Sequence, residues 1–109
     1  MFYAEGNELK GCNVRIVQDS LNEPWTPIRK DGQIIKMGYF DVLFSYLENT
    51  VILDYGNDSR NGLFDGKLLR DRLVATDSGL LIGKADMMLK DKVLGTSYFV
   101  LKERRKLNF

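Results

Sequence analysis

The chain has 109 residues, of which 44% are hydrophobic and 28% are charged, and its net charge is +1. These values predict one folded domain spanning residues 1–109, with a core that needs no disulfide or metal ion. The near-neutral charge argues against nucleic acid or an anionic membrane as the partner, because no global field attracts either. The sequence has no histidine, which removes the usual base at neutral pH and the commonest metal ligand.

We expect neither a signal peptide nor a transmembrane segment. The first residues of the chain lack a basic segment followed by an apolar stretch, and no apolar run approaches the roughly 18–20 residues that span a bilayer. A single cysteine, Cys12, excludes an internal disulfide and fits a reducing compartment. We therefore expect a cytoplasmic protein with no membrane span, no metal and no cofactor.

The N-terminal third predicts strands around one long loop. Residues 8–17 end in alternation and predict a strand with Cys12, Val14 and Ile16 on one side. Residues 18–31 hold both prolines and predict a loop that Trp25 pins, closed by an Asp-Gly pair. Residues 33–37 predict a short strand.

Residues 39–47 fit two different patterns. As a helix they would be amphipathic, but Phe40 and Phe44 would be poorly covered. As a strand, the same two rings share a face with Val42, and Glu48–Asn49 supplies a turn into the β-rich residues 50–55. We favour the hairpin and keep one short helix near residues 35–47 as the alternative.

The second half continues the β pattern. Residues 56–62 predict an exposed loop, and residues 68–76, 81–89 and 96–103 predict strands separated by turns. The chain thus holds about seven short strands at a spacing typical of sandwiches and barrels. We predict an all-β fold, either a small antiparallel barrel or a strongly curved half-barrel.

The strand at residues 81–89 has an unusual face. Leu81, Gly83, Ala85, Met87 and Leu89 alternate on one side, so that side is apolar at its ends and narrow in the middle. A narrow middle suits a curved sheet, where bulkier side chains would collide across the concave side. That concave side either packs a core or holds a ligand.

Several short motifs in the second half resemble a known group of proteins. They lie at Ser45–Tyr55, Leu69–Leu73, Ser78–Gly83 and Tyr98–Leu101. Their order resembles small bacterial domains with lipocalin-like (calycin) barrels, and is similar to the C-terminal half of proteins named for a Gly-x-Trp-x-Gly motif. The resemblance covers residues 45–103, and the Gly-x-Trp-x-Gly motif itself does not occur. It implies a ligand-holding β-barrel.

Arg70 and Asp71 interrupt an otherwise apolar strand. A charge that points inward must be paired or must bind something polar, and an inward arginine can receive a carboxylate head group. The structural alternative is an Arg–Asp pair at a barrel rim, or charges that protect a strand edge. The predicted ligand-binding residues are Tyr55, Arg70, Asp71, Leu81, Gly83, Ala85, Met87 and Phe99.

We expect non-covalent binding of a hydrophobic or amphipathic, lipid-like small molecule, with no catalytic residue. If side chains fill the interior, the domain is instead an interaction module or a homodimer that pairs through a strand edge. An enzyme would have to use Asp54, Asp71 and Tyr98 as acid and base. A nucleic-acid site would have to use the basic cluster at 102–106 with Tyr98 and other aromatic residues.

Overall fold

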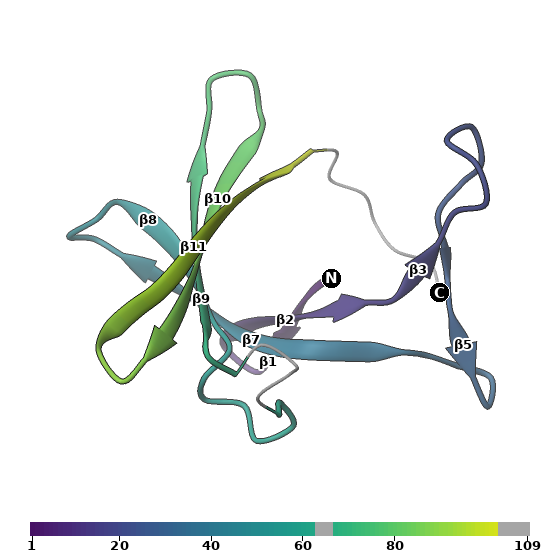
Figure 1. Ribbon diagram of the computed structural model, residues 1–109, viewed down its shortest axis with the longest axis horizontal. Helices are drawn as coiled ribbons and strands as arrows, with labels where there is room; N and C mark the ends of the chain where they lie inside the picture. The colour runs from purple at the N-terminus through teal and green to yellow at the C-terminus, as the bar shows by residue number, and fades with distance from the viewer. Residues whose placement is uncertain (63–66, 103–109) are drawn as a thin grey trace.

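The computed structural model describes residues 1–62 and 67–102. Their main feature is a seven-stranded sheet in which all neighbouring strands are antiparallel (Figure 1). In spatial order its strands are β1 (Phe2–Glu5), β2 (Glu8–Val14), β7 (Lys36–Ser45), β8 (Thr50–Asp54), β9 (Leu69–Ala75), β10 (Leu81–Leu89) and β11 (Lys92–Leu101). The described residues contain no helix, which confirms the all-β class.

Two small sheets lie in the sequence between β2 and β7. β3 (Ile16–Val17) pairs with β4 (Thr26–Pro27), and β5 (Arg29–Lys30) pairs with β6 (Gln33–Ile34). Both small sheets lie at the end of β7 that is far from β9, β10 and β11 (Figure 1). They are therefore remote from most of the residues predicted to bind a ligand.

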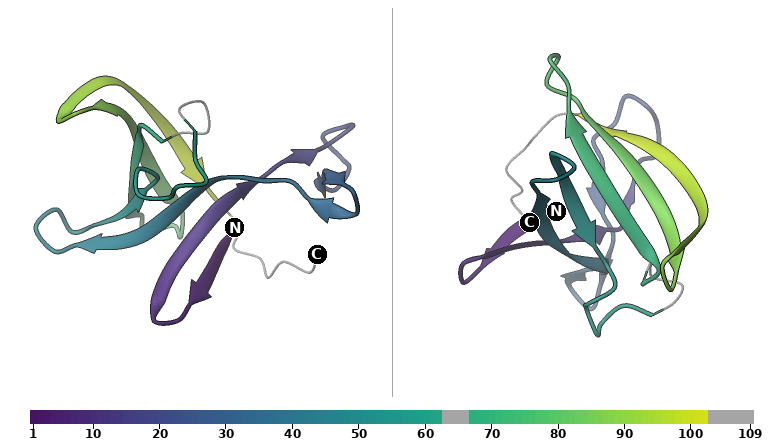
Figure 2. Two further views of the ribbon diagram at one scale, coloured as in Figure 1. Left: turned by 90° about the horizontal axis from the view of Figure 1, so that it is seen from below. Right: turned by 90° about the vertical axis from the view of Figure 1, so that its left-hand side faces the viewer.

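The large sheet is open. It curves strongly, as Figure 2 shows, but its edge strands β1 and β11 do not pair with each other. Within residues 1–62 and 67–102, β11 pairs only with β10. The sheet is therefore not closed into a barrel, and a fully enclosed interior is absent from the part of the chain described.

The hairpin predicted at residues 39–55 is confirmed, and the alternative helix near residues 35–47 is wrong. β7 and β8 pair directly, with Val42 opposite Leu53 and Phe44 opposite Val51. Phe40 is 4% exposed in this arrangement. A strand places Phe40 and Val42 on one face toward the core, whereas a helix would have left Phe40 uncovered.

Two expectations for the N-terminal third are wrong. The predicted common side of Cys12, Val14 and Ile16 does not exist, because β2 ends at Val14 and Ile16 belongs to a separate sheet. A bulge between β2 and β7 also breaks the alternation there, and Gly38 in β7 has the positive φ of 55° that such an irregularity favours. Trp25 is 63% exposed, so it does not pin its loop.

The core is small and occupies one face of the sheet. Phe40, Leu53, Tyr55 and Leu73 are buried together, and the rings of Phe40 and Tyr55 are 5.1 Å apart. We call the face that carries these side chains the inner face and the opposite one the outer face. Six hydrophobic residues are buried among the described residues, against nineteen large hydrophobic residues that are exposed. Much apolar surface therefore remains uncovered by the described part of the chain.

Candidate functional site

The residues predicted to bind a ligand divide between the two faces. Leu81, Gly83, Ala85 and Met87 lie on the inner face of β10, and Asp71 lies on the inner face of β9 directly opposite Ala85. Arg70 is next to Asp71 in β9 and therefore lies on the outer face. The predicted anchors Arg70 and Tyr55 thus cannot serve a single cavity on the inner face.

The narrow middle of β10 is filled by a neighbouring strand. Gly83 pairs with Phe99 of β11, and a Cβ atom at position 83 would lie far inside van der Waals contact with the Phe99 ring. Gly11 and Phe40 form the same kind of pair between β2 and β7. In both pairs the missing side chain makes room for an aromatic ring that covers the inner face, and so Gly83 does not open a void.

Asp71 and Tyr55 form a buried polar pair on the inner face. The Tyr55 hydroxyl donates a hydrogen bond of 3.3 Å to Asp71 Oδ2, and the two residues are 5% and 6% exposed. Asp71 Oδ1 is buried without a hydrogen-bond partner among the described residues. Burial raises the pKa of the Asp71 carboxyl and, with the nearby Asp71 charge, the pKa of the Tyr55 hydroxyl.

On the outer face, polar residues line up across six strands. Consecutive cross-strand partners form one row that crosses the sheet from β2 to β11: Lys10, Asp41, Asp54, Arg70, Asp86 and Thr96. Lys10 pairs with Asp41 at 3.3 Å. Arg70 therefore has a carboxylate on each side of it, from Asp54 in β8 and Asp86 in β10.

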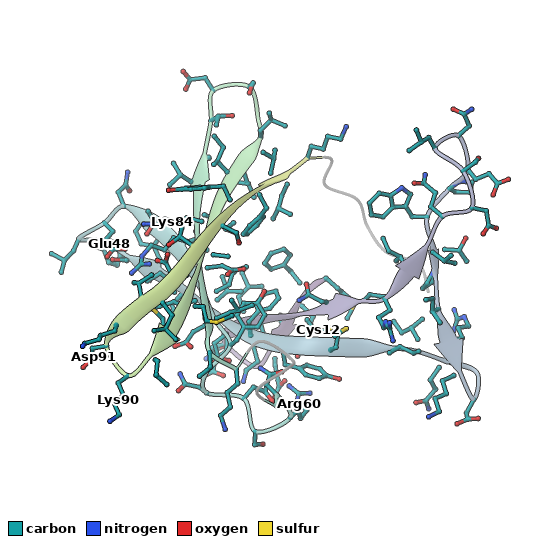
Figure 3. All side chains as sticks on the ribbon, viewed as in Figure 1. Cys12, Glu48, Arg60, Lys84, Lys90 and Asp91 are labelled. Atoms are coloured by element: carbon teal, nitrogen blue, oxygen red, sulfur yellow. The ribbon has the colours of Figure 1, made fainter. Side chains whose placement is uncertain are left out.

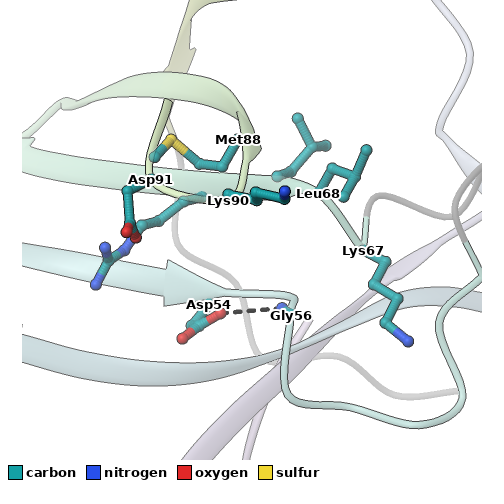
Figure 4. A pocket seen from close by; sticks show the side chains of 9 residues that line it. Asp54, Gly56, Lys67, Leu68, Met88, Lys90 and Asp91 are labelled. Carbon is teal, nitrogen blue, oxygen red and sulfur yellow. Dashed lines mark hydrogen bonds between the residues drawn. The ribbon is translucent and has the colours of Figure 1, made fainter. Parts of the chain in front are cut away.

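Arg70 lines an open pocket of about 310 Å³ at the end of the sheet where β8 ends and β9 begins (Figure 4). The pocket is also lined by two further cations, two carboxylates and three apolar side chains. Its lining residues are Asp54, Gly56, Lys67, Leu68, Leu69, Arg70, Met88, Lys90 and Asp91. The combination of cationic groups and apolar side chains suits a molecule that has both an acidic and a hydrophobic part.

A second depression, of about 240 Å³, lies beside β10 and β11. Ala85 and Met87 line it from the inner face of β10. The β11 residues that line it are Leu94, Gly95, Thr96 and Ser97. Leu69 lines both this depression and the Arg70 pocket. The two hollows are thus adjacent, on either side of one leucine.

The sequence interpretation missed a polar network on the outer face. Asp86 is 2% exposed and accepts hydrogen bonds of 2.7 Å from Arg72 Nη1 and from the Thr96 hydroxyl. Arg72 also donates through Nε to Glu48, at 2.9 Å, in the turn between β7 and β8. Figure 3 shows Glu48 and Lys84 on the same side of the sheet. Alternation alone assigns Asp86 to a solvated face, so it gave no sign of this burial.

Asn61 is a second structural residue that composition did not reveal. The predicted exposed loop at residues 56–62 buries Asn61 to 4% exposure. Its Oδ1 accepts from the Tyr39 amide at 2.8 Å, and its Nδ2 donates to the carbonyls of Tyr39 and Tyr55 at 2.6 and 2.8 Å. These bonds attach the loop to β7 and to the end of β8, beside the Arg70 pocket.

The groups considered for catalysis are not assembled. Asp71 lies on the inner face, whereas Asp54 and Tyr98 lie on the outer face of different strands. The described residues contain no cluster of three potential metal ligands, and no helix in them is long and apolar enough to cross a membrane. Most of the basic cluster at 102–106 lies outside the described residues.

Comparisons with protein-family models, with curated proteins and with solved structures found no match for this chain.

Proposed function

We propose that the protein binds an amphipathic small molecule at the end of the sheet where the two hollows meet. The head group lies in the Arg70 pocket, and the apolar tail passes Leu69 into the depression beside Ala85 and Met87. The observation that carries the proposal is that Leu69 lines both hollows. One hollow is lined by charged and apolar groups, and the other is lined mainly by apolar groups.

The dimensions support a ligand of modest size. Small-molecule sites commonly occupy about 300–1,000 Å³. The Arg70 pocket has about 310 Å³ and the depression about 240 Å³, and both are open to solvent. Exposed apolar groups on the walls, such as Met87 at 46% and Leu94 at 59%, would lose water contact on binding, which is favourable.

The test uses Nile red, an uncharged apolar dye whose fluorescence increases in apolar surroundings. Gly95 lines the depression, and a Cβ atom there meets nothing within 4 Å, so a longer side chain fits the fold. Gly95→Glu should weaken dye binding about tenfold, because it places a charge in the apolar hollow. Val100→Glu is the matched control, since Val100 is exposed on the outer face of the same strand.

The proposal requires that the wild type and Val100→Glu bind the dye equally well. It is overturned if the wild-type protein does not bind Nile red, or if Gly95→Glu binds it as tightly as the wild type. Circular dichroism of both variants checks that the sheet is intact.

A second function, homodimerisation, is favoured by one specific observation. β11 is a ten-residue edge strand with no proline, and residues 93–101 carry no charge. Tyr98 is 73% exposed and Val100 is 58% exposed on its outer face. An exposed, uncharged edge strand is a template for pairing with another strand, and a second copy of β11 would add antiparallel about a two-fold axis.

Light scattering during gel filtration tests this second function. The mean mass should rise with protein concentration, and Tyr98→Lys should abolish the rise, because a lysine on an edge strand opposes pairing. Ile82→Lys is the control, since Ile82 is exposed on β10, which is paired on both sides. A mass equal to the monomer at every concentration would exclude the dimer.

A further inference from the structure

We infer that the Arg70 pocket recognises one anionic group, a carboxylate or a phosphate, and that Arg70 is the residue that binds it. This inference rests on the proposed function and adds the chemical class of the head group. The site lies at the strand ends, where Arg70 of the outer face and Leu69, which packs against the core, both line the pocket.

The first observation is that both carboxylates next to Arg70 are engaged elsewhere. Asp54 accepts hydrogen bonds from the Gly56 amide at 2.9 Å and from Asn57 Nδ2 at 3.2 Å. Asp86 accepts from Arg72 and Thr96, both at 2.7 Å. The row of cross-strand partners thus places Arg70 between two acids that accept hydrogen bonds from other donors and none from Arg70 among the described residues.

The second observation is that Arg70 has no ion pair within residues 1–62 and 67–102. Its Nε is buried and has no hydrogen-bond partner in the same part of the chain. A buried donor without a partner costs free energy, and native proteins leave few such groups unexplained. Arg72, two residues further along the same face, pairs with two carboxylates. The lack of an ion pair at Arg70 is therefore not a general property of arginines on this face.

The third observation is the charge of the pocket. Lys67 and Lys90 line it with Arg70, and Figure 4 shows both lysine side chains in the same part of the molecule as the bond between Asp54 and Gly56. Asp54 and Asp91 supply the opposing charges. Three cations against two carboxylates leave one positive charge, which one bound anion would balance. A guanidinium matches the geometry of carboxylate and phosphate oxygens through two parallel hydrogen bonds.

Competition against Nile red distinguishes the possible head groups. Decanoate, decyl phosphate and decanol each have ten carbon atoms in one unbranched chain and differ mainly in the head. For the wild type, we expect decanoate or decyl phosphate to displace the dye at a concentration about tenfold lower than decanol does. The acid that displaces the dye at the lower concentration shows whether the pocket prefers a carboxylate or a phosphate head group.

Arg70→Met should remove that preference and leave displacement by decanol unchanged, whereas Arg70→Lys should keep part of it. Lys84→Met is the matched control, because Lys84 is an exposed cation of β10 outside the pocket. As a readout that does not use the dye, inorganic phosphate at constant ionic strength should raise the unfolding temperature of the wild type but not that of Arg70→Met.

The two proposals fail in different ways. If neither the dye nor any of the three ligands binds, the proposed function is wrong. If decanol and both acids bind the wild type equally, or if Arg70→Met keeps the preference for acids, binding stands and the inference about Arg70 is overturned.

Discussion

The ring of Phe99 occupies the space on β10 that a side chain at position 83 would need. The contact explains why position 83 is a glycine. A narrow position in a curved strand can leave room for a ligand, but here it leaves room for an aromatic ring of the adjacent strand. The two hollows lie further along the sheet, and Leu69 lines both of them.

Gly83→Ala should destabilise the fold, because the new methyl group must displace the Phe99 ring. We expect a loss of about 2 kcal/mol in the free energy of unfolding, in the usual range for overpacking. Gly95→Ala is the control, since a Cβ atom at position 95 meets nothing within 4 Å. Urea unfolding of both variants provides the measurement, and equal stability of the two would contradict the packing described here.

Asp71→Asn should change the way stability depends on pH. Burial raises the pKa of Asp71 in the folded state, and Asp86, on the other face of the sheet, raises it further, while Tyr55 opposes the shift by hydrogen bonding. The unfolded state therefore loses this proton at a lower pH than the folded state does. Stability falls as pH rises from the ordinary carboxyl pKa, near about 4, through the raised folded value.

Replacing the carboxyl by an amide removes that loss. At neutral pH we expect Asp71→Asn to be more stable than the wild type by about 1 kcal/mol, with the gain disappearing once the pH falls below the ordinary carboxyl pKa. Denaturant titrations at several pH values measure the difference. Asp77→Asn, at an exposed turn, should show no such trend. A gain for Asp71→Asn that grows toward acid pH would refute the sign of the shift.

The two acidic partners of Arg72 should differ in their contribution to stability. The Asp86 side chain is 2% exposed and the Glu48 side chain is 47% exposed. Asp86→Ala leaves a part-buried guanidinium and the Thr96 hydroxyl without their acceptor, and should cost about 3 kcal/mol. Glu48→Ala removes an exposed pair and should cost less than about 1 kcal/mol. Thermal and urea unfolding compare them, and similar losses would argue against a buried role for Asp86.

The sequence predicted the local structure better than the arrangement of the sheet. Alternation located β9 and β10 and correctly placed Leu81, Gly83, Ala85 and Met87 on one face. Alternation also implies that Arg70 and Asp71 face opposite ways, but which one faces the core depends on contacts with Leu53 and Ala85 in neighbouring strands. Such contacts are non-local, so spacing along the chain does not specify them.

The same limit applies to the sheet edges and to the missed polar residues. Whether β11 meets β1 depends on curvature accumulated over seven strands, which no single segment encodes. Asp86 is buried because Arg72 and Thr96 approach it from two other strands. Asn61 is buried because it bonds to the backbone of Tyr39, which is 22 residues away in the sequence. Neither residue differs in its local sequence from an ordinary exposed polar residue.

A crystal structure of the protein with decanoate or decyl phosphate would show whether Arg70 and Leu69 hold an amphipathic acid. We expect the acidic head to lie within hydrogen-bond distance of the Arg70 guanidinium and the alkyl chain to contact Leu69, Ala85 and Met87. A ligand bound elsewhere on the sheet, or Arg70 paired with a carboxylate of its own chain while the pocket stays empty, would contradict this expectation.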